Sequence, residues 1–200
     1  MERLPSRSIQ TVTDRLTALQ CSSTIVWQIP AQCHPFRVNK GSDSHKKKRR
    51  PVLHFEFLVH RPALVGVAEY GLLCEHSFTG EEEWQQQLWS NVGDLSVTGD
   101  GKTILLACYS HGIQCHDGQG RQVGSYQIGG TVSRVSTSFL SGRIAAATME
   151  GHFYYIHHDG RVEFQATLPD DVCRLFCDPT GAGVVVGLTS GRVMRLDWGM

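Results

Sequence analysis

The sequence predicts an all-β fold that is built from about four repeated units. The chain has 200 residues, of which 21 are glycine, and its apolar residues fall in short runs. Glycine tolerates positive φ, so this combination is typical of strands joined by tight turns. Pairs such as Asp100-Gly101 and Thr180-Gly181 recur between the runs and favour hairpin turns.

The apolar residues also repeat at a spacing of forty. One such series could arise by chance, because apolar residues are common, but several series share the same phase. Together they predict internal repeats, with units at 52–91, 92–131, 132–171 and 172–200, the last of them incomplete. The series are Val52, Val92, Val132 and Val172; Phe55, Leu95, Val135 and Leu175; Leu73, Ile113, Phe153 and Val193; and Gly80, Gly120 and Gly160.

Each unit predicts four strands. The first strand, for example DLSVT, is followed by an almost wholly apolar second strand, as in ILLAC, IAAAT or VVVGL. A short, continuous apolar run is typical of a strand that is covered on both faces. A third strand such as GHFYYIHH alternates, and a fourth such as RQVGSY follows a further turn. Four antiparallel strands in forty residues predict the blades of a β-propeller-like array.

Two stretches carry a resemblance to a known family. VCRLFCDPTG, from Val172, resembles the opening of a WD repeat, and GRVMRLDW, from Gly191, resembles its later strand. The likeness covers residues 52–200. The Gly-His dipeptide that commonly precedes a WD blade is missing, however, and Asp197-Trp198 reverses the usual order. Turns such as HDGRV are also similar to those of quinoprotein-type propellers.

This resemblance implies a non-catalytic scaffold that mediates protein–protein binding. It leaves one alternative open, a quinoprotein-like (PQQ-type) propeller enzyme or an inactive remnant of one. Such an enzyme needs acidic ligands for calcium, whereas the acids here fall mostly in turns, as Asp100 and Asp159 do. No catalytic, cofactor-binding or metal-ligating residue is assigned, and no cofactor is expected.

Residues 1–51 break the period. The chain has zero formal net charge, but basic residues outnumber acidic ones before residue 52, and the reverse holds after it. We expect a largely irregular basic arm with one strand at 24–29. One cluster in the arm predicts a nuclear import signal, a patch that binds the phosphates of nucleic acid or of anionic lipid, or a solvated linker. It comprises Lys46, Lys47, Lys48, Arg49 and Arg50.

The final unit has no fourth strand of its own. We expect Thr24–Ile29 to supply it by pairing with Val193–Asp197, which would close the propeller. The alternatives are a partial propeller, or copies that self-associate, because an open array exposes strand edges and an apolar face.

Trp84 and Trp89, in EEEWQQQLW, are the candidate partner-binding residues within the repeats. Tryptophan is enriched at the energetic centres of protein interfaces. The alternative is that both side chains pack as a cover over the outer strand.

The cysteines and histidines predict no metal site. Cys173 and Cys177 are expected to share one buried strand face with Leu175. Seven cysteines form no disulfide framework, and no signal peptide or membrane-spanning segment is evident. We therefore expect a cytoplasmic protein, or a nuclear one if the basic cluster directs import. Five histidines are expected to be solvated turn residues: His111, His116, His152, His157 and His158.

Overall fold

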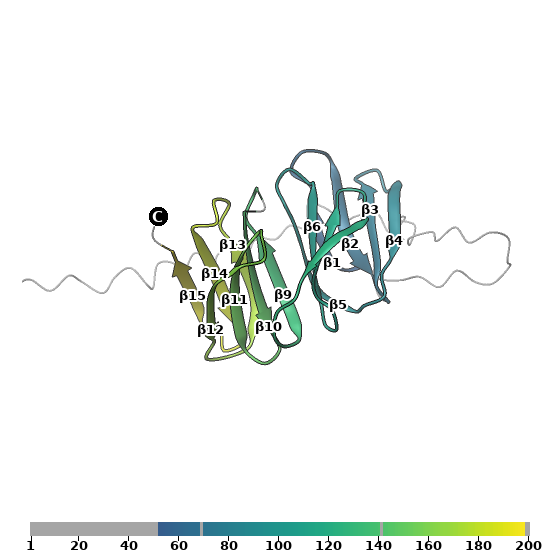
Figure 1. The fold of residues 1–200 in the computed structure, drawn as a ribbon. Coiled ribbons are helices and arrows are strands. Elements are labelled where there is room, and N and C mark those ends of the chain that lie inside the picture. Colours follow the sequence, from purple (N-terminus) through teal and green to yellow (C-terminus); the bar gives the residue numbers. More distant parts are fainter. Residues whose placement is uncertain (1–51, 69, 141, 199–200) are drawn as a thin grey trace, which may run out of the picture. The chain divides into compact units, whose positions relative to one another are not determined.

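The structure is a computed structural model that describes residues 52–68, 70–140 and 142–198. Within these ranges every regular element is a β-strand, and the strands form four antiparallel sheets (Figure 1). The predicted all-β array of about four blades is therefore confirmed. The expected strand at 24–29 and the basic cluster at 46–50 lie outside the described residues.

Each sheet is one blade, and its strands follow one another in sequence order. Blade 1 contains β1 (Val52–Phe57), β2 (Ala63–Ala68), β3 (Leu72–Ser77) and β4 (Glu82–Gln87). Blade 2 contains β5 (Val92–Val97), β6 (Thr103–Cys108), β7 (Gly112–Asp117) and β8 (Gln122–Tyr126). Blade 3 contains β9 (Val132–Thr137), β10 (Arg143–Thr148), β11 (His152–His157) and β12 (Val162–Thr167). Blade 4 contains three described strands, β13 (Val172–Cys177), β14 (Gly183–Leu188) and β15 (Val193–Asp197).

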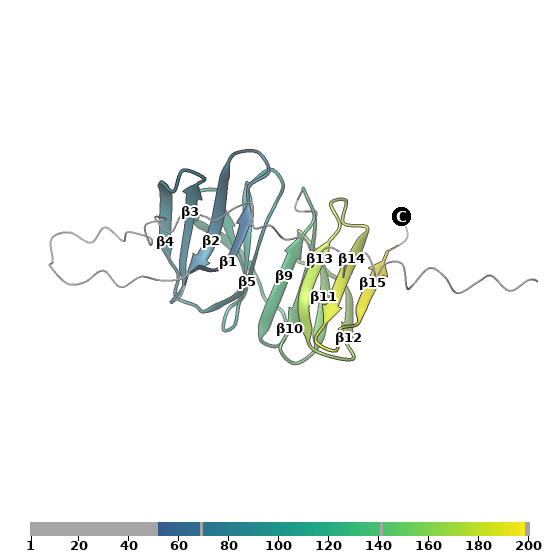
Figure 2. The ribbon, with the colours of Figure 1, turned by 180° about the vertical axis from the view of Figure 1, so that it is seen from behind.

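The first strand of each blade lies beside the first strand of the next one. Contacts join β1 to β5, β5 to β9, and β9 to β13. Both views show β13 next to β9 (Figure 2). These four first strands are called the inner strands below. The second strands are among the least exposed, as the sequence predicts, and β6 is buried along nearly its whole length.

The hydrophobic core lies between blades. Each blade has a forward face, on the side of the following blade, and a backward face, on the side of the preceding one. Val65 and Leu73 on the forward face of blade 1 pack with Leu95 and Ile104 on the backward face of blade 2. The same register recurs between blades 2 and 3 and between blades 3 and 4. Three buried interfaces of one kind therefore hold the array together.

The interface between blades 3 and 4 also contains an aromatic stack. The indole of Trp198 lies on the ring of Tyr155, with centroids 3.8 Å apart and an interplanar angle of 3°. The Tyr155 hydroxyl donates to the carbonyl of Gly181 in blade 4. Trp198, from the reversed Asp197-Trp198 pair, is partly buried and packs against the core of this interface.

Hydrogen bonds join successive inner strands at one repeated position, and we call them the inner-strand rungs. Ser96 Oγ accepts from the backbone N–H of Thr137 at 3.2 Å. Ser136 Oγ accepts from the N–H of Cys177 at 2.9 Å. In blade 1 the carboxylate of Glu56 fills the same position and accepts from the N–H of Val97. Burial raises the pKa of Glu56 to about 7, so its charge is only weakly favoured near neutral pH.

Arg134 adds a second kind of link across three inner strands. Its Nη1 donates to the carbonyls of Gly93 in β5 and Ser133 in β9, at 3.1 and 2.7 Å. Its Nε donates to the carbonyl of Cys173 in β13, at 3.2 Å. One guanidinium therefore satisfies carbonyls of blades 2, 3 and 4.

Two expectations about single residues are wrong. His116 is 2 % exposed, because its ring lies inside the β7–β8 hairpin and bonds the carbonyl of Gly120 at 2.9 Å. Cys173 does not share the core face with Leu175 and Cys177. A β-bulge between the first and third residues of β13 shifts the register, so Val172 takes that place.

Arg134→Met should lower the free energy of unfolding by about 2 kcal/mol, because hydrogen bonds to a charged group are lost and partly buried carbonyls stay unpaired. Arg174→Met is the matched control. Arg174 holds the equivalent position in blade 4, but it is exposed and donates only to the neighbouring carbonyl of Cys173. Urea unfolding measures both variants. Equal losses would show that the link across the blades contributes nothing.

Candidate functional site

The blades present two rims made of turns. Because the strands alternate in direction, the β2–β3, β6–β7 and β10–β11 turns lie at the same edge as the connections between blades. This edge is called the connection rim. The β1–β2, β5–β6 and β7–β8 hairpins lie at the opposite edge, called the hairpin rim. Functional residues commonly lie in such turns, which a rigid scaffold positions.

The connection rim carries a small hollow between blades 1 and 2. Its volume is about 260 Å³, and its lining includes Leu53, His54, Tyr70, Asn91 and Tyr109. Apolar, aromatic and hydrogen-bonding groups therefore meet at one place. Its walls come from two different blades, so it exists only when the blades are packed together.

The β2–β3 turn sets one wall of this hollow. Tyr70 has a φ of 61° and Gly71 a φ of 70°, so both lie in the left-handed region. That region is unfavourable for a residue with a side chain, and such strain often marks functional turns. The amide of Gln87 holds the turn from β4 by donating to the carbonyl of Tyr70 at 2.7 Å. The exposed phenol is thus held at the rim.

Tyr109 forms the facing wall from the β6–β7 turn. A Cβ on Gly93 would lie 2.7 Å from Cε1 of the Tyr109 ring, so the glycine makes room for the ring to lie on the inner strand. The ring stays partly exposed. Gly93 has extended backbone, and the close approach of the ring is what requires the glycine here.

The structure separates the two candidate tryptophans. Trp89 is 95 % exposed in the connection between blades 1 and 2, on the connection rim. It follows Leu88, whose N–H donates to the carbonyl of Gly71, a residue that lines the hollow. Trp84 packs against the core between blades 1 and 2, and its Nε1 donates to Glu75 at 2.9 Å. Trp84 therefore occupies a covering position, and Trp89 an exposed one beside the hollow.

A polar series at the forty-residue spacing links the hollow to the inner strands. The sequence analysis does not identify this series, because it defines the repeat by apolar residues and glycines. His54 lines the hollow, and its Nδ1 lies 3.9 Å from Oδ1 of Asp94. Burial lowers the pKa of His54 and raises that of Asp94. The inner-strand bulges turn this series away from the apolar interfaces, and its members are His54, Asp94, Arg134 and Arg174.

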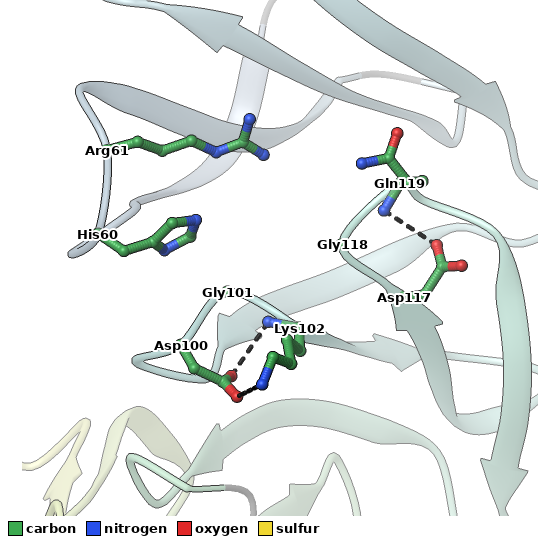
Figure 3. Close-up of a pocket in the computed structure, with 8 residues that line it drawn as sticks. All are labelled: His60, Arg61, Asp100, Gly101, Lys102, Asp117, Gly118 and Gln119. Carbon is green, nitrogen blue, oxygen red and sulfur yellow. Dashed lines mark hydrogen bonds and ion pairs between the residues drawn. The ribbon is translucent and has the colours of Figure 1, made fainter.

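The hairpin rim carries a larger, charged hollow of about 480 Å³ (Figure 3). His60 and Arg61 extend from one wall toward Gln119 on the other. The two carboxylates in its lining already cap their own turns. Asp100 accepts from the N–H of Lys102, and Asp117 accepts from the N–H of Gln119.

A buried ion pair lies next to the charged hollow. Glu75 is fully buried, and its Oε2 accepts from Nη2 of Arg61 at 2.6 Å and from Nε1 of Trp84 at 2.9 Å. Burial raises the pKa of Glu75, while the charge of Arg61 opposes that rise. The Arg61 side chain is partly exposed to solvent, whereas the Glu75 side chain is fully buried.

Several cysteines among the described residues have raised thiol pKa values. Burial raises the pKa of the Cys74 and Cys177 thiols to about 12 and that of Cys108 to about 11, so these thiols stay protonated. Within residues 52–68, 70–140 and 142–198, no three His, Cys, Asp or Glu side chains are grouped to hold a metal ion. No helix in these ranges could span a membrane.

The repeated four-stranded blades define the fold as β-propeller-like. The chain is similar to the β-propeller domain of Cps50 (Swd1) from Myceliophteria thermophila, with a TM-score of 0.64 and 16 % sequence identity. The alignment covers 75 % of this chain and 55 % of that one, so the chain spans about half the length of the structure it matches. No family model matches the sequence, and no curated protein does. The predicted resemblance is confirmed for the fold.

The ion pair beside the charged hollow predicts that replacing Arg61 lowers the stability of the protein more than replacing Glu75. Arg61→Met should lower the free energy of unfolding by about 3 kcal/mol, because it leaves a buried carboxylate without its cation. Glu75→Gln should lower the free energy of unfolding by less than about 1 kcal/mol, because the amide oxygen can still accept from Trp84 and the Arg61 side chain is partly exposed.

Urea unfolding of both single variants and of the double variant checks this. The double variant should recover most of the loss of Arg61→Met. If the two single variants were equally unstable, the buried carboxylate would not be the costly partner.

Proposed function

We propose that this chain is a non-catalytic protein-binding module whose partner docks on the connection rim. The observation that carries the proposal is the aromatic group around the small hollow. Tyr70 and Tyr109 line the hollow, and Trp89 is almost wholly exposed beside it. Tyrosine and tryptophan supply most of the binding energy in many protein interfaces, since they bury a large area at little cost in side-chain entropy.

The size of the hollow indicates the kind of ligand. At about 260 Å³ it is smaller than the usual range of about 300–1,000 Å³ for sites that enclose a small molecule. It can instead accept one side chain of a bound segment. His54 and Asn91 supply polar groups in the lining that could bond the backbone of that segment.

The hairpin rim fits this role less well. Its hollow is larger, but its lining carboxylates are engaged by their own turns and by basic neighbours. Lys102 and Arg61 are likewise paired, with Asp100 and Glu75. A partner there would have to replace contacts that already exist.

Two observations on the class of fold support the proposal. WD40 propellers typically serve as interaction scaffolds, and rigid blades display rim turns without changing shape. The cluster Lys46–Arg50 remains a second, independent prediction. Binding of nucleic acid through it would weaken steeply with salt and vanish when the five cations are neutralised. A quinoprotein-like enzyme would instead show a bound quinone in the absorption spectrum of the purified protein.

Trp89→Ala should weaken the binding of a connection-rim ligand at least tenfold, or about 1.4 kcal/mol. The probe is a peptide selected from a random displayed library against the full chain, and calorimetry measures its affinity. Tyr109→Ala should show a similar loss.

Leu140→Ala is the control, because Leu140 is an exposed apolar residue in the β9–β10 turn of the hairpin rim. The Leu140→Ala variant should bind the selected peptide with the same affinity as the unmodified chain. Peptides that lose affinity only with Leu140→Ala would contradict the proposed rim, and a failure to select any peptide would contradict the binding function.

A further inference from the structure

Within the described part of the chain, both end blades expose apolar residues at positions that are buried in the other blades. Residues equivalent to Val193 in the repeat, namely Leu73, Ile113 and Phe153, are all 0 % exposed on forward faces. Val193, on the forward face of blade 4, is 69 % exposed. Monomers rarely expose core positions of this kind, so the face indicates a missing contact.

Blade 1 shows the opposite half of the same interface. On backward faces, Leu95, Val135 and Leu175 are at most 8 % exposed, whereas their equivalent Phe55 is 57 % exposed. Phe57 is also exposed, and its ring lies edge-on to that of Phe55 with centroids 5.6 Å apart. The uncovered surface of blade 1 is thus an aromatic one.

The residue at the rung position of blade 4 also fits this pairing. Ser96 and Ser136 accept a backbone N–H forty-one residues further on. The equivalent residue in blade 4 is Phe176, which is exposed and cannot accept a hydrogen bond. In the same register, Phe176 would lie against Phe57 of a blade 1. An aromatic contact would then replace the hydrogen bond.

We infer that two copies of this chain associate head to tail, with the forward face of blade 4 in each copy packed on the backward face of blade 1 in the other. The three internal interfaces are made of these same two halves, so the contact continues an interface that the chain already forms three times. Two such contacts related by a two-fold axis close a ring. It would contain about eight blades, which lies within the range of closed propellers.

This pairing differs from the one expected for Thr24–Ile29. That segment would extend the sheet of blade 4 along the free edge of β15, whereas the second copy would cover the face of the sheet. The pairing is also independent of ligand binding, because the connection rim is formed by turns and not by the end faces. The two proposals can therefore fail separately.

Sedimentation velocity of the full chain over a wide range of concentration tests the inference. We expect a discrete dimer, and Val193→Arg should raise its dissociation constant at least tenfold, because it places a charge on the apolar face. Val123→Arg is the matched control. Val123 is 66 % exposed on the outer strand β8, away from both end faces, so the dimer should persist.

Disulfide trapping then tests the register. A mixture of the single variants Phe55→Cys and Val193→Cys should give a dimer linked between positions 55 and 193, and neither variant alone should give it. Unchanged melting curves would show that both variants remain folded, as expected for exposed positions. A monomer at all concentrations, open-ended polymers, or a dimer that Val193→Arg leaves intact would overturn the inference.

Discussion

The packing of each blade on the next is the contact on which the rest of this structure depends. No blade encloses the core by itself, because each buried apolar cluster combines residues of two neighbouring sheets. The inner-strand rungs fix how far one blade can slide along the next. A bond from Thr137 N–H to Ser96 Oγ forms in one register only, since a shift by one residue would turn the hydroxyl to the other face. Apolar burial thus supplies the stability, and the rungs supply the alignment.

The same contact creates the candidate site. Tyr70 and Tyr109 belong to different blades, and they line one hollow because the first interface holds their turns together. Local strain at Tyr70 is tolerated because Gln87 and the end of β4 hold the turn. The site therefore needs no element beyond the repeat, only turns whose side chains differ from blade to blade. This explains how a regular array can carry a local binding surface.

The sequence predicted the fold well because the period is a property of many residues at once. Glycine turns, the dry second strands and the phase of Val52, Val92, Val132 and Val172 all gave the same answer. The site was harder to predict, because it depends on single side chains. Trp89 was identified as a candidate, but Tyr70 and Tyr109 lie in turns with no pattern of their own. The bulge in β13 and the burial of His116 depend on backbone register within a hairpin, which composition does not reveal. The polar series through His54 and Asp94 could have been found by applying the forty-residue step to polar residues.

Hydrogen–deuterium exchange at three inner-strand amides tests the central claim most directly. The N–H groups of Val97, Thr137 and Cys177 point away from their own sheets and bond only to the preceding blade. If the blades pack in the register described, these amides should exchange at least about a hundredfold more slowly than exposed turn amides, and at similar rates in all three blades. Exchange as fast as in the turns would show that the rungs do not form and that the blades are not aligned in this way.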